Sequence, residues 1–352
     1  MNRRAILFIG NFLSQSLGTI GPSEELAQRL SEMGWQVCMT SRQIKKTRRL
    51  LDMLGTVWRR RQEYDLAHLD VYSGPAFFWA EAAACLLGRL RKPYILTLHG
   101  GNLPVFAGRW PQRLRRLLGQ ARAVTTPSPY LHQTMQPYSQ SLHLIPNALD
   151  MARYPCRQRR QPAPRLIWLR AFHAIYRPDL APQVVALLGS EFPAIHLTMI
   201  GPDKHDGSRE RTLEAARKLQ VADRLALPGR ITKAEVPQRL AQGDIFLNTT
   251  NVDNTPVSVL EAMACGLGVV STNVGGIPYL LEHEHDALLV PPNDPEAMAA
   301  AVRRLLTELE LAKRLSGNAR KKAEQFDWSV ILPQWEALFN RITQGNRPMA
   351  GN

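Results

Sequence analysis

The chain has 352 residues, 45% of them hydrophobic, so it can bury a full core and is long enough for two domains of ordinary size. Its four cysteines lie far apart and form no Cys-x-x-Cys pair, which argues against a disulfide framework and favours a reducing compartment. No apolar stretch reaches the roughly 20 residues that a membrane-spanning helix needs, and the start shows no secretory signal pattern. A cytoplasmic protein of two domains is expected.

The formal net charge of +14 is unevenly distributed, since residues 1–155 carry 20 Lys/Arg against 9 Asp/Glu and the remainder carries 24 against 21. Basic clusters with neighbouring Trp or Leu occur over Lys45–Arg49, Trp58–Arg61 and Arg109–Arg116. Such clusters suit anionic lipid, although a charge of this size can also serve solubility alone. No recognised nucleic-acid module occurs. We therefore expect peripheral binding to the anionic inner face of the plasma membrane, and no nucleic-acid partner.

Short apolar runs alternate with helical patterns along the first half of the chain. Ala5–Ile9 is predicted to form a strand, and a loop with Gly18 and Gly21 follows it. The pattern of Glu24–Met33 predicts a helix. Further strands are expected over Gln36–Thr40, Leu66–Leu69, Tyr94–Leu98, Val124–Thr126 and Leu142–Ile145. This alternation favours a parallel sheet wrapped by helices.

After the turn Pro146–Asp150, the polar and proline-bearing stretch Pro155–Pro164 is interpreted as an interdomain linker. Strands then resume over Leu166–Leu169, His196–Ile200, Leu225–Leu227, Ile245–Asn248, Val269–Ser271 and Ala287–Val290. The fold class is α/β, with two tandem doubly wound, Rossmann-like domains that face a cleft. We expect them over residues 1–155 and 156–327, with a C-terminal helix at 328–345 packing back on the first. Ligands should bind at the carboxyl ends of the strands.

The most informative motif is Asp253–Gly266, which directly follows the strand Ile245–Asn248. Thr255 is predicted to cap a helix whose first residue is Pro256. The free N–H groups at the start of that helix would form a site for a diphosphate. A capped surface helix with incidental acidic residues is the alternative.

Two carboxylates flank this anion site, and carboxylates repel a diphosphate unless its hydroxyl-rich ends need them. Glu261 lies more than a turn into the helix, where it can accept hydrogen bonds from vicinal ribose hydroxyls. Asp253 lies in the preceding loop and faces whatever group the diphosphate carries. The pair therefore indicates a nucleotide linked to a second hydroxylated group, such as a sugar.

This acidic pair resembles that of retaining glycosyltransferases of the GT-B fold, in the large family 4 (group 1) type that includes sucrose synthase and bacterial mannosyltransferases. The resemblance covers nearly the whole chain. It includes His99-Gly100, Ile145–Asp150, Arg170, Ile200-Gly201-Pro202, Pro228-Gly229-Arg230-Ile231, Val274–Pro278 and Ala287–Pro292.

The resemblance implies a role for each matching residue. Glu261 would bind the ribose, Asp253 would contact hydroxyls of the donor sugar, and Arg170 would neutralise the leaving phosphate. His99 would support the sugar in an oxocarbenium-like transition state, although a lone histidine is more often structural. The remaining donor-binding residues would be Gly201, Arg230, Asn254, Thr255, Pro256, Val257 and Ser258.

The sequence departs from the family pattern at three positions. Asp253 stands where Glu is usual, which leaves the donor sugar open, and Tyr279 also replaces a usual Glu. The lysine that normally accompanies Arg170 is absent. We expect Arg177 to replace it, because its guanidinium stays charged and grips phosphate in bidentate fashion, with His173 as the alternative.

The cluster His283–Asp286 contains metal-ligand residue types, but it is better explained as a polar turn before a strand. No Asp-x-Asp pair of the kind that holds a divalent ion for a diphosphate was identified. We therefore expect an enzyme without metal or other cofactor, in which the nucleotide-sugar is a co-substrate.

The function that these observations favour is retaining sugar transfer from a UDP- or GDP-type donor to a glycan or lipid-linked glycan, in cell-surface polysaccharide synthesis. A nucleotide-sugar 2-epimerase of the same fold is one alternative, and a non-catalytic membrane or nucleic-acid binding protein is another. A dinucleotide oxidoreductase is excluded, because the loop after Gly10 lacks the GxGxxG turn. The donor base, sugar, acceptor, linkage and oligomeric state stay open.

Overall fold

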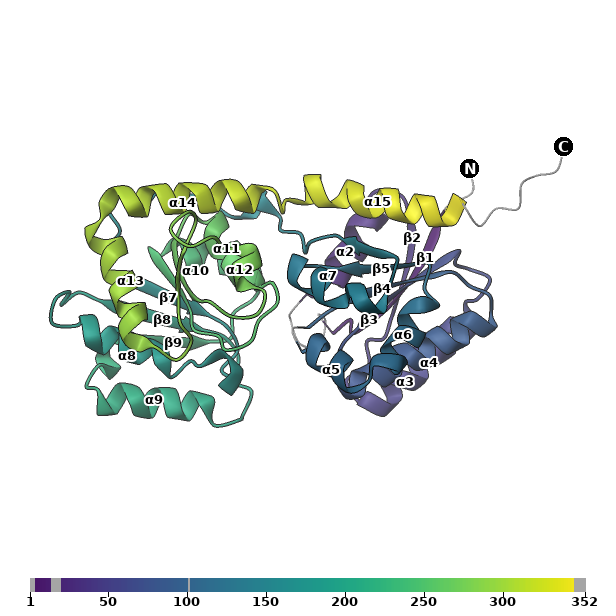
Figure 1. Cartoon of the computed structure of the whole chain (residues 1–352), viewed down its shortest axis with the longest axis horizontal. Coiled ribbons are helices and arrows are strands. Elements are labelled where there is room, and N and C mark those ends of the chain that lie inside the picture. Colours follow the sequence, from purple (N-terminus) through teal and green to yellow (C-terminus); the bar gives the residue numbers. More distant parts are fainter. Residues whose placement is uncertain (1–3, 14–19, 101, 345–352) are drawn as a thin grey trace. The chain divides into compact units, whose positions relative to one another are not determined.

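The computed structural model describes residues 4–13, 20–100 and 102–344, and Figure 1 shows a sheet with its own helices in each of two parts. The first unit comprises Met1–Ala148 and Ser329–Asn352, and the second unit comprises Leu149–Trp328. The boundary expected after residue 155 lies after Ala148 instead, because Leu149, Met151 and Tyr154 are buried in the core of the second unit. Gly18 and Gly101 lie outside the described residues.

The first unit contains a six-stranded parallel sheet in the order β2-β1-β3-β4-β5-β6. Its strands are β1 (Ala5–Ile9), β2 (Gln36–Thr40), β3 (Leu66–Val71), β4 (Tyr94–Leu98), β5 (Ala123–Thr126) and β6 (Leu142–Leu144). Every residue of β1 and β4 is buried, as expected for parallel strands that helices cover on both faces.

Helices from both ends of the chain surround this sheet. They are α2 (Pro22–Glu32), α3 (Lys46–Arg59), α4 (Pro75–Arg89), α5 (Leu103–Arg109), α6 (Pro111–Gly119), α7 (Pro129–Met135) and α15 (Trp328–Gln344). The ring of Phe339 in α15 lies 6.5 Å from that of Phe8 and 6.0 Å from that of Trp35. Helix α15 therefore completes the hydrophobic core that β1 and the residues before β2 begin. Residue 345 of the expected helix lies outside the described residues.

The second unit repeats the scheme with the order β12-β11-β10-β7-β8-β9. Its strands are β7 (Arg165–Leu169), β8 (His196–Ile200), β9 (Leu225–Gly229), β10 (Ile245–Asn248), β11 (Gly268–Thr272) and β12 (Leu288–Val290). Its helices are α8 (Leu180–Leu188), α9 (Ser208–Lys218), α10 (Val236–Ala241), α11 (Val257–Ala264), α12 (Ile277–Leu280), α13 (Pro295–Thr307) and α14 (Leu309–Glu324). No described helix is long and apolar enough to cross a membrane.

The stretch Pro155–Pro164 lies within the second unit, so its interpretation as an interdomain linker is wrong. Arg159 is only 2% exposed and donates to the carbonyl of Gly243 at 2.9 Å. The buried carboxylate of Asp244 holds the same segment through Arg157, at 2.6 Å. These arginine contacts pack the proline-bearing stretch against the rest of the second unit. The composition of the stretch does not predict them, because Asp244 lies 87 residues after Arg157 in the chain.

In both sheets the order in which strands are added reverses next to the first strand, and this strand reversal positions the site in each unit. From β1 the chain adds β2 on one side and β3 on the other, and from β7 it adds β8 on one side and β10 on the other. The loops that leave these neighbouring strands diverge, and ligands of open α/β sheets bind in the resulting crevice. Ligand-binding residues are therefore expected in the loops after β1 and β3 and after β7 and β10.

Candidate functional site

Arg170 and Asp253 meet at the strand reversal of the second unit. Arg170 directly follows β7, Asp253 follows the neighbouring β10, and their side chains form an ion pair with exposures of only 18% and 11%. The guanidinium carbon of Arg170 lies 4.5 Å from the ring centroid of Tyr176. Burial lowers the pKa of Arg170, while Tyr176 and Glu261 act to raise it. The guanidinium stays charged, and its buried Nε has no hydrogen-bond partner.

Glu261 lies in α11 and is only 4% exposed. Its Oε1 accepts a hydrogen bond from the hydroxyl of Tyr154 at 2.7 Å and forms an ion pair with Nζ of Lys233. Burial and then Glu261 raise the pKa of Tyr154. Tyr154 therefore remains a hydrogen-bond donor to Glu261 at every working pH.

Helix α11 begins one residue later than expected. Pro256 is the N-cap, not the first helical residue, because its extended ψ of 113° lets its carbonyl accept from Val259 at 3.1 Å and Leu260 at 3.3 Å. Thr255 therefore precedes the cap. The N–H groups of Val257 and Ser258 have no earlier helical carbonyl to bond. The hydroxyl of Ser258 is buried there without a partner.

Two glycines allow the loops around Arg170 and Asp253 to approach one another. A Cβ on Gly201, whose φ is +152°, would lie 1.7 Å from the carbonyl oxygen of Arg170. A Cβ on Gly276 would lie 1.9 Å from the carbonyl oxygen of Asn254. Any larger residue would displace these loops. Gly201 and Gly276 therefore allow these backbone segments to pack closely. Within the loop, the N–H of Asn254 donates to the carboxylate of Asp253 at 2.9 Å.

The other expected donor-binding cations lie near the ends of β7 and β9. Arg177 donates to both carboxylate oxygens of Asp179 at 3.0 Å and also contacts Asn293. His173 uses Nδ1 to accept the N–H of Ile175 at 3.2 Å. Arg230 directly follows β9 and is exposed. The structure thus brings Arg170, Asp253, Glu261 and the start of α11 together, whereas Arg177 and His173 make bonds to their own surroundings.

His99 directly follows β4 in the first unit and is backed by a buried carboxylate. Its Nε2 lies 3.0 Å from Oδ1 of Asp70, which also accepts from the hydroxyl of Ser23 at 2.6 Å. Tyr72 stacks on the imidazole with a centroid distance of 5.2 Å. Burial acts to raise the pKa of Asp70, but His99, His68 and Ser23 together lower it below its ordinary value. Asp70 therefore accepts from Nε2 and directs Nδ1 away from itself.

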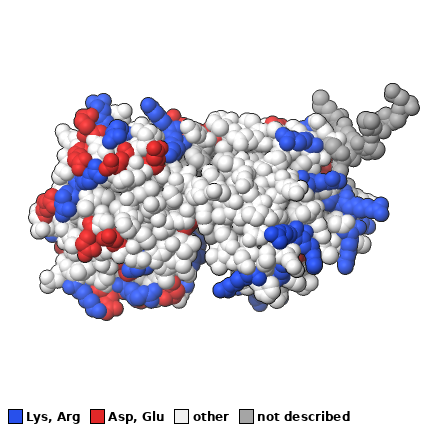
Figure 2. All heavy atoms as spheres, in the orientation of Figure 1, with Lys and Arg blue, Asp and Glu red and all other residues white. Residues whose placement is uncertain are grey.

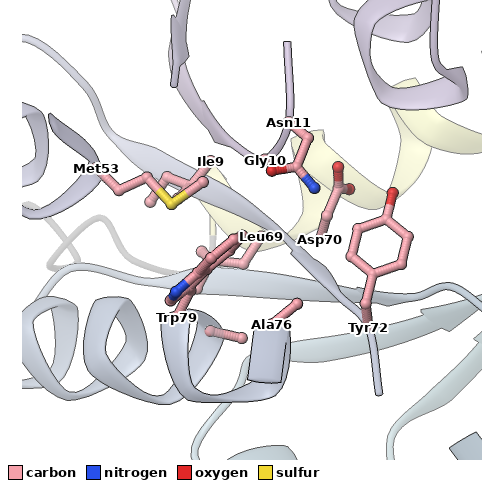
Figure 3. Close-up of a pocket in the computed structure, with 10 residues that line it drawn as sticks. Ile9, Gly10, Asn11, Met53, Leu69, Asp70, Tyr72, Ala76 and Trp79 are labelled. Carbon is pink, nitrogen blue, oxygen red and sulfur yellow. The ribbon is translucent and has the colours of Figure 1, made fainter. Parts of the chain in front are cut away.

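A small pocket adjoins Asp70 at the strand reversal of the first unit. Figure 3 shows Asn11, Asp70 and Tyr72 on one side of it and Met53 and Trp79 on the other. A Cβ on Gly10 would lie 2.3 Å from Oδ2 of Asp70, so only glycine lets the end of β1 pass this carboxylate. The pocket combines hydrogen-bonding groups with an aromatic wall, and its volume of about 10 Å³ is that of a single water molecule.

Three residues of these sites escaped the sequence analysis. Asp70 was detectable, because it is an acidic residue at the carboxyl end of a buried strand beside the strand of His99. Lys233 had a weaker signal, as it follows the Pro228-Gly229-Arg230-Ile231 motif in a polar loop. Tyr154 had none, because only the fold brings residue 154 to Glu261.

The residues His283–Asp286 form a turn with other partners. Nδ1 of His283 accepts the N–H of Leu289 at 3.0 Å, and Glu284 pairs with Arg304 at 2.6 Å. Within residues 4–13, 20–100 and 102–344, no three His, Cys, Asp or Glu side chains group as metal ligands.

The geometry of two doubly wound units agrees with sequence comparison. Residues 160–322 match the family model described as Glycosyl transferases group 1, and residues 21–153 match that described as Glycosyltransferase Family 4. The chain belongs to the group 1 glycosyltransferases. The expected fold class is confirmed, since solved GT-B glycosyltransferases share the two-unit architecture of this enzyme.

Several named relatives are similar over most of this glycosyltransferase. N-acetyl-alpha-D-glucosaminyl L-malate synthase of Bacillus anthracis is 26% identical over 82% of this chain and 77% of its own. D-inositol 3-phosphate glycosyltransferase of Jonesia denitrificans is 20% identical over 92% and 80%. Among solved structures, sucrose-phosphate synthase of Thermosynechococcus elongatus superposes with a TM-score of 0.79 at 19% identity, covering 98% of this chain and 100% of that one. HepE of Anabaena, solved with UDP, gives 0.75 at 17% identity, covering 96% and 100%.

Proposed function

We propose that this glycosyltransferase moves a sugar, with retention of its anomeric configuration, from a nucleotide-sugar to a glycan or lipid-linked glycan in cell-surface polysaccharide synthesis. The observation that carries the donor class is the set of groups around the start of α11. Arg170 supplies a buried cation, Ser258 a buried hydroxyl without a partner, and Glu261 a fixed carboxylate. A diphosphate flanked by a ribose and a sugar satisfies all three.

Each group then has a part in the transfer. Arg170 and the N–H groups at the start of α11 stabilise charge on the departing diphosphate. The ribose hydroxyls bond to Glu261, and the sugar hydroxyls bond to Asp253 in place of some of its contact with Arg170. His99, oriented by Asp70, supports the sugar as positive charge develops at its anomeric carbon. This division of labour needs no metal ion.

A ligand panel tests the donor class directly. Binding of one nucleotide-sugar raises the melting temperature, because a ligand that binds only the folded state stabilises it by mass action. UDP-sugars come first, since the similar Anabaena protein was solved with UDP, and GDP-sugars follow. NMR of the product then assigns the anomeric configuration. An inverted product rules out retention, and activity lost in EDTA and restored by a divalent ion rules out metal independence.

The first unit also supports the proposal that the acceptor is met at an anionic membrane. Figure 2 shows Lys and Arg gathered over this unit with few acidic residues, while the second unit mixes both signs. Ile44, Leu51 and Trp58 are 61%, 69% and 52% exposed and are spaced by seven along α3 and the residue pair before it. Leu51 and Trp58 share one face of α3, with Ile44 just before the helix, and exposed apolar side chains beside basic residues suit insertion among lipid headgroups.

A vesicle assay tests membrane binding. The basic residues to change are Lys45, Lys46 and Arg48, which are exposed. Arg49 of the same cluster is only 8% exposed and donates to the carbonyl of Gln43 at 2.7 Å, so its replacement would disturb the fold. Changing the three to Gln should weaken binding to anionic vesicles by about 1 kcal/mol per charge. Equal binding to neutral vesicles, or binding that salt does not weaken, contradicts the proposal.

A further inference from the structure

The donor site needs more positive charge than Arg170 provides. Asp253 and Glu261 together carry two negative charges, and a nucleoside diphosphate adds more. Arg177 is held by both oxygens of Asp179, and His173 is engaged with the N–H of Ile175. Arg177 and His173 thus pair with groups other than Arg170, Asp253 and Glu261, and they leave this charge unbalanced.

Lys233 is the cation that the fold brings to the site. It follows β9 in the chain, and its ammonium pairs with Glu261 while its side chain remains 25% exposed. The same Oε1 of Glu261 already accepts from Tyr154 at 2.7 Å. Glu261 therefore keeps a donor if Lys233 leaves. A lysine ammonium on its four-carbon stem can move several ångströms at little cost.

Two buried groups at the same place independently require an acceptor. The hydroxyl of Ser258, in the first turn of α11, and Nε of Arg170 are both buried without hydrogen-bond partners. Buried donors of this kind are normally satisfied, and anionic oxygens would satisfy both. Glu261 also acts to raise the pKa of Arg170, so the two ends of the site interact electrostatically.

We propose that Lys233 is the second cation of the donor site: the ribose displaces it from Glu261, and it then binds the diphosphate. This inference rests on the proposed donor class. It makes Lys233 a binding residue whose contribution depends on the number of phosphates. A structural partner of Glu261 would instead affect the nucleoside, the monophosphate and the diphosphate alike.

Calorimetric titration of the full-length chain with uridine, UMP and UDP, and with guanosine, GMP and GDP, separates these roles. We expect Lys233→Met to weaken diphosphate binding roughly ten- to a hundredfold, the range for one lost charge-assisted hydrogen bond. Nucleoside affinity should stay unchanged or rise, because the ribose no longer competes with Lys233. Lys218→Met is the matched control, since Lys218 pairs with Glu214 on the surface and is 74% exposed.

Each outcome decides the matter. Equal losses for nucleoside and diphosphate, or undiminished diphosphate affinity in Lys233→Met, overturn the role of Lys233. If Lys233→Met does not fold, Lys233→Gln carries the same expectation, because its amide can still donate to Glu261. A diphosphate loss in Arg177→Gln or His173→Ala, with none in Lys233→Met, returns the role to those residues. If the wild type binds neither diphosphate, the proposed donor class fails, and this inference with it.

Discussion

The two units place different chemistry at the same point of the same architecture. In the second unit, the strand reversal brings together Arg170 and Asp253 from the ends of β7 and β10. In the first, it brings the end of β1 at Gly10 against Asp70 on β3. One site holds cations paired with carboxylates, and the other holds a buried carboxylate that orients a histidine. Topology therefore fixes where a ligand binds, while the side chains at the strand ends decide which ligand.

The two units also differ in which segments of the chain complete their hydrophobic cores. The first unit needs α15, from the far end of the chain, to cover Phe8 and His68. The second unit is continuous in sequence. A substitution in the core-facing side of α15 should thus destabilise the first unit more than the second. Substitutions at the strand ends should lower catalytic activity more than they lower stability.

The largest effect is expected for Phe339→Ala. Phe339 is fully buried against Phe8, Trp35 and Trp335, so truncation should reduce the free energy of unfolding of the first unit by about 3–5 kcal/mol. Denaturant unfolding, followed by hydrogen exchange in each unit, measures this. Equal loss of protection in both units would show that α15 does not belong to the first unit alone.

Arg170→Gln should lower turnover roughly a hundred- to a thousandfold, the range for removing one group that stabilises developing charge. It leaves Asp253 without its partner, so the matched control is Arg170→Gln with Asp253→Asn, which removes both charges of the pair. Steady-state kinetics with the donor found by the ligand panel gives the comparison. Turnover within threefold of the wild type in Arg170→Gln would remove Arg170 from the reaction.

Acid should destabilise the first unit through His68. This residue is 1% exposed, and burial lowers its pKa from 6.5 to about 4, against the opposing influence of Asp70. Because the unfolded chain binds the proton more tightly, stability is complete above pH 6.5 and falls as pH drops toward 4, by up to about 3 kcal/mol. The pH dependence of urea midpoints should weaken in His68→Gln. An unchanged pH dependence in that variant would assign the effect to other groups.

The smallest of the four effects is expected for Asp70→Asn. The amide can still bond to His99 but no longer requires a proton on Nε2, so turnover should fall roughly ten- to a hundredfold, as for other residues that orient a histidine. The affinity for the nucleoside diphosphate should not change, because Asp70 lies in the first unit. Donor turnover and diphosphate titration together check this, with Ser23→Ala as a milder variant at the same carboxylate. Loss of diphosphate affinity in Asp70→Asn would contradict the assignment.

Strand positions could be predicted from the sequence where a short apolar run was enough to define them. Ala5–Ile9 and Tyr94–Leu98 were predicted with the bounds that the structure has, because fully buried parallel strands are continuous apolar runs between polar loops. The sequence prediction failed at Pro155–Pro164, where proline and charge suggested a linker but Asp244, far along the chain, binds the arginines. It also set the start of α11 one residue early, since propensity alone does not decide between neighbouring caps.

What the sequence determined by itself was the order of strands and helices, the basic first half, and the motif residues Arg170, Asp253 and Glu261, because each depends on residues close together in the chain. Tertiary structure alone decided which charges meet. Lys233 and Tyr154 converge on Glu261 because the fold brings a loop after β9 and a segment before β7 to helix α11. Asp70 orients His99 because the parallel strands β3 and β4 end at the same edge of a sheet. Coulombic and hydrogen-bond energies depend on separations of a few ångströms, which spacing along a chain does not specify.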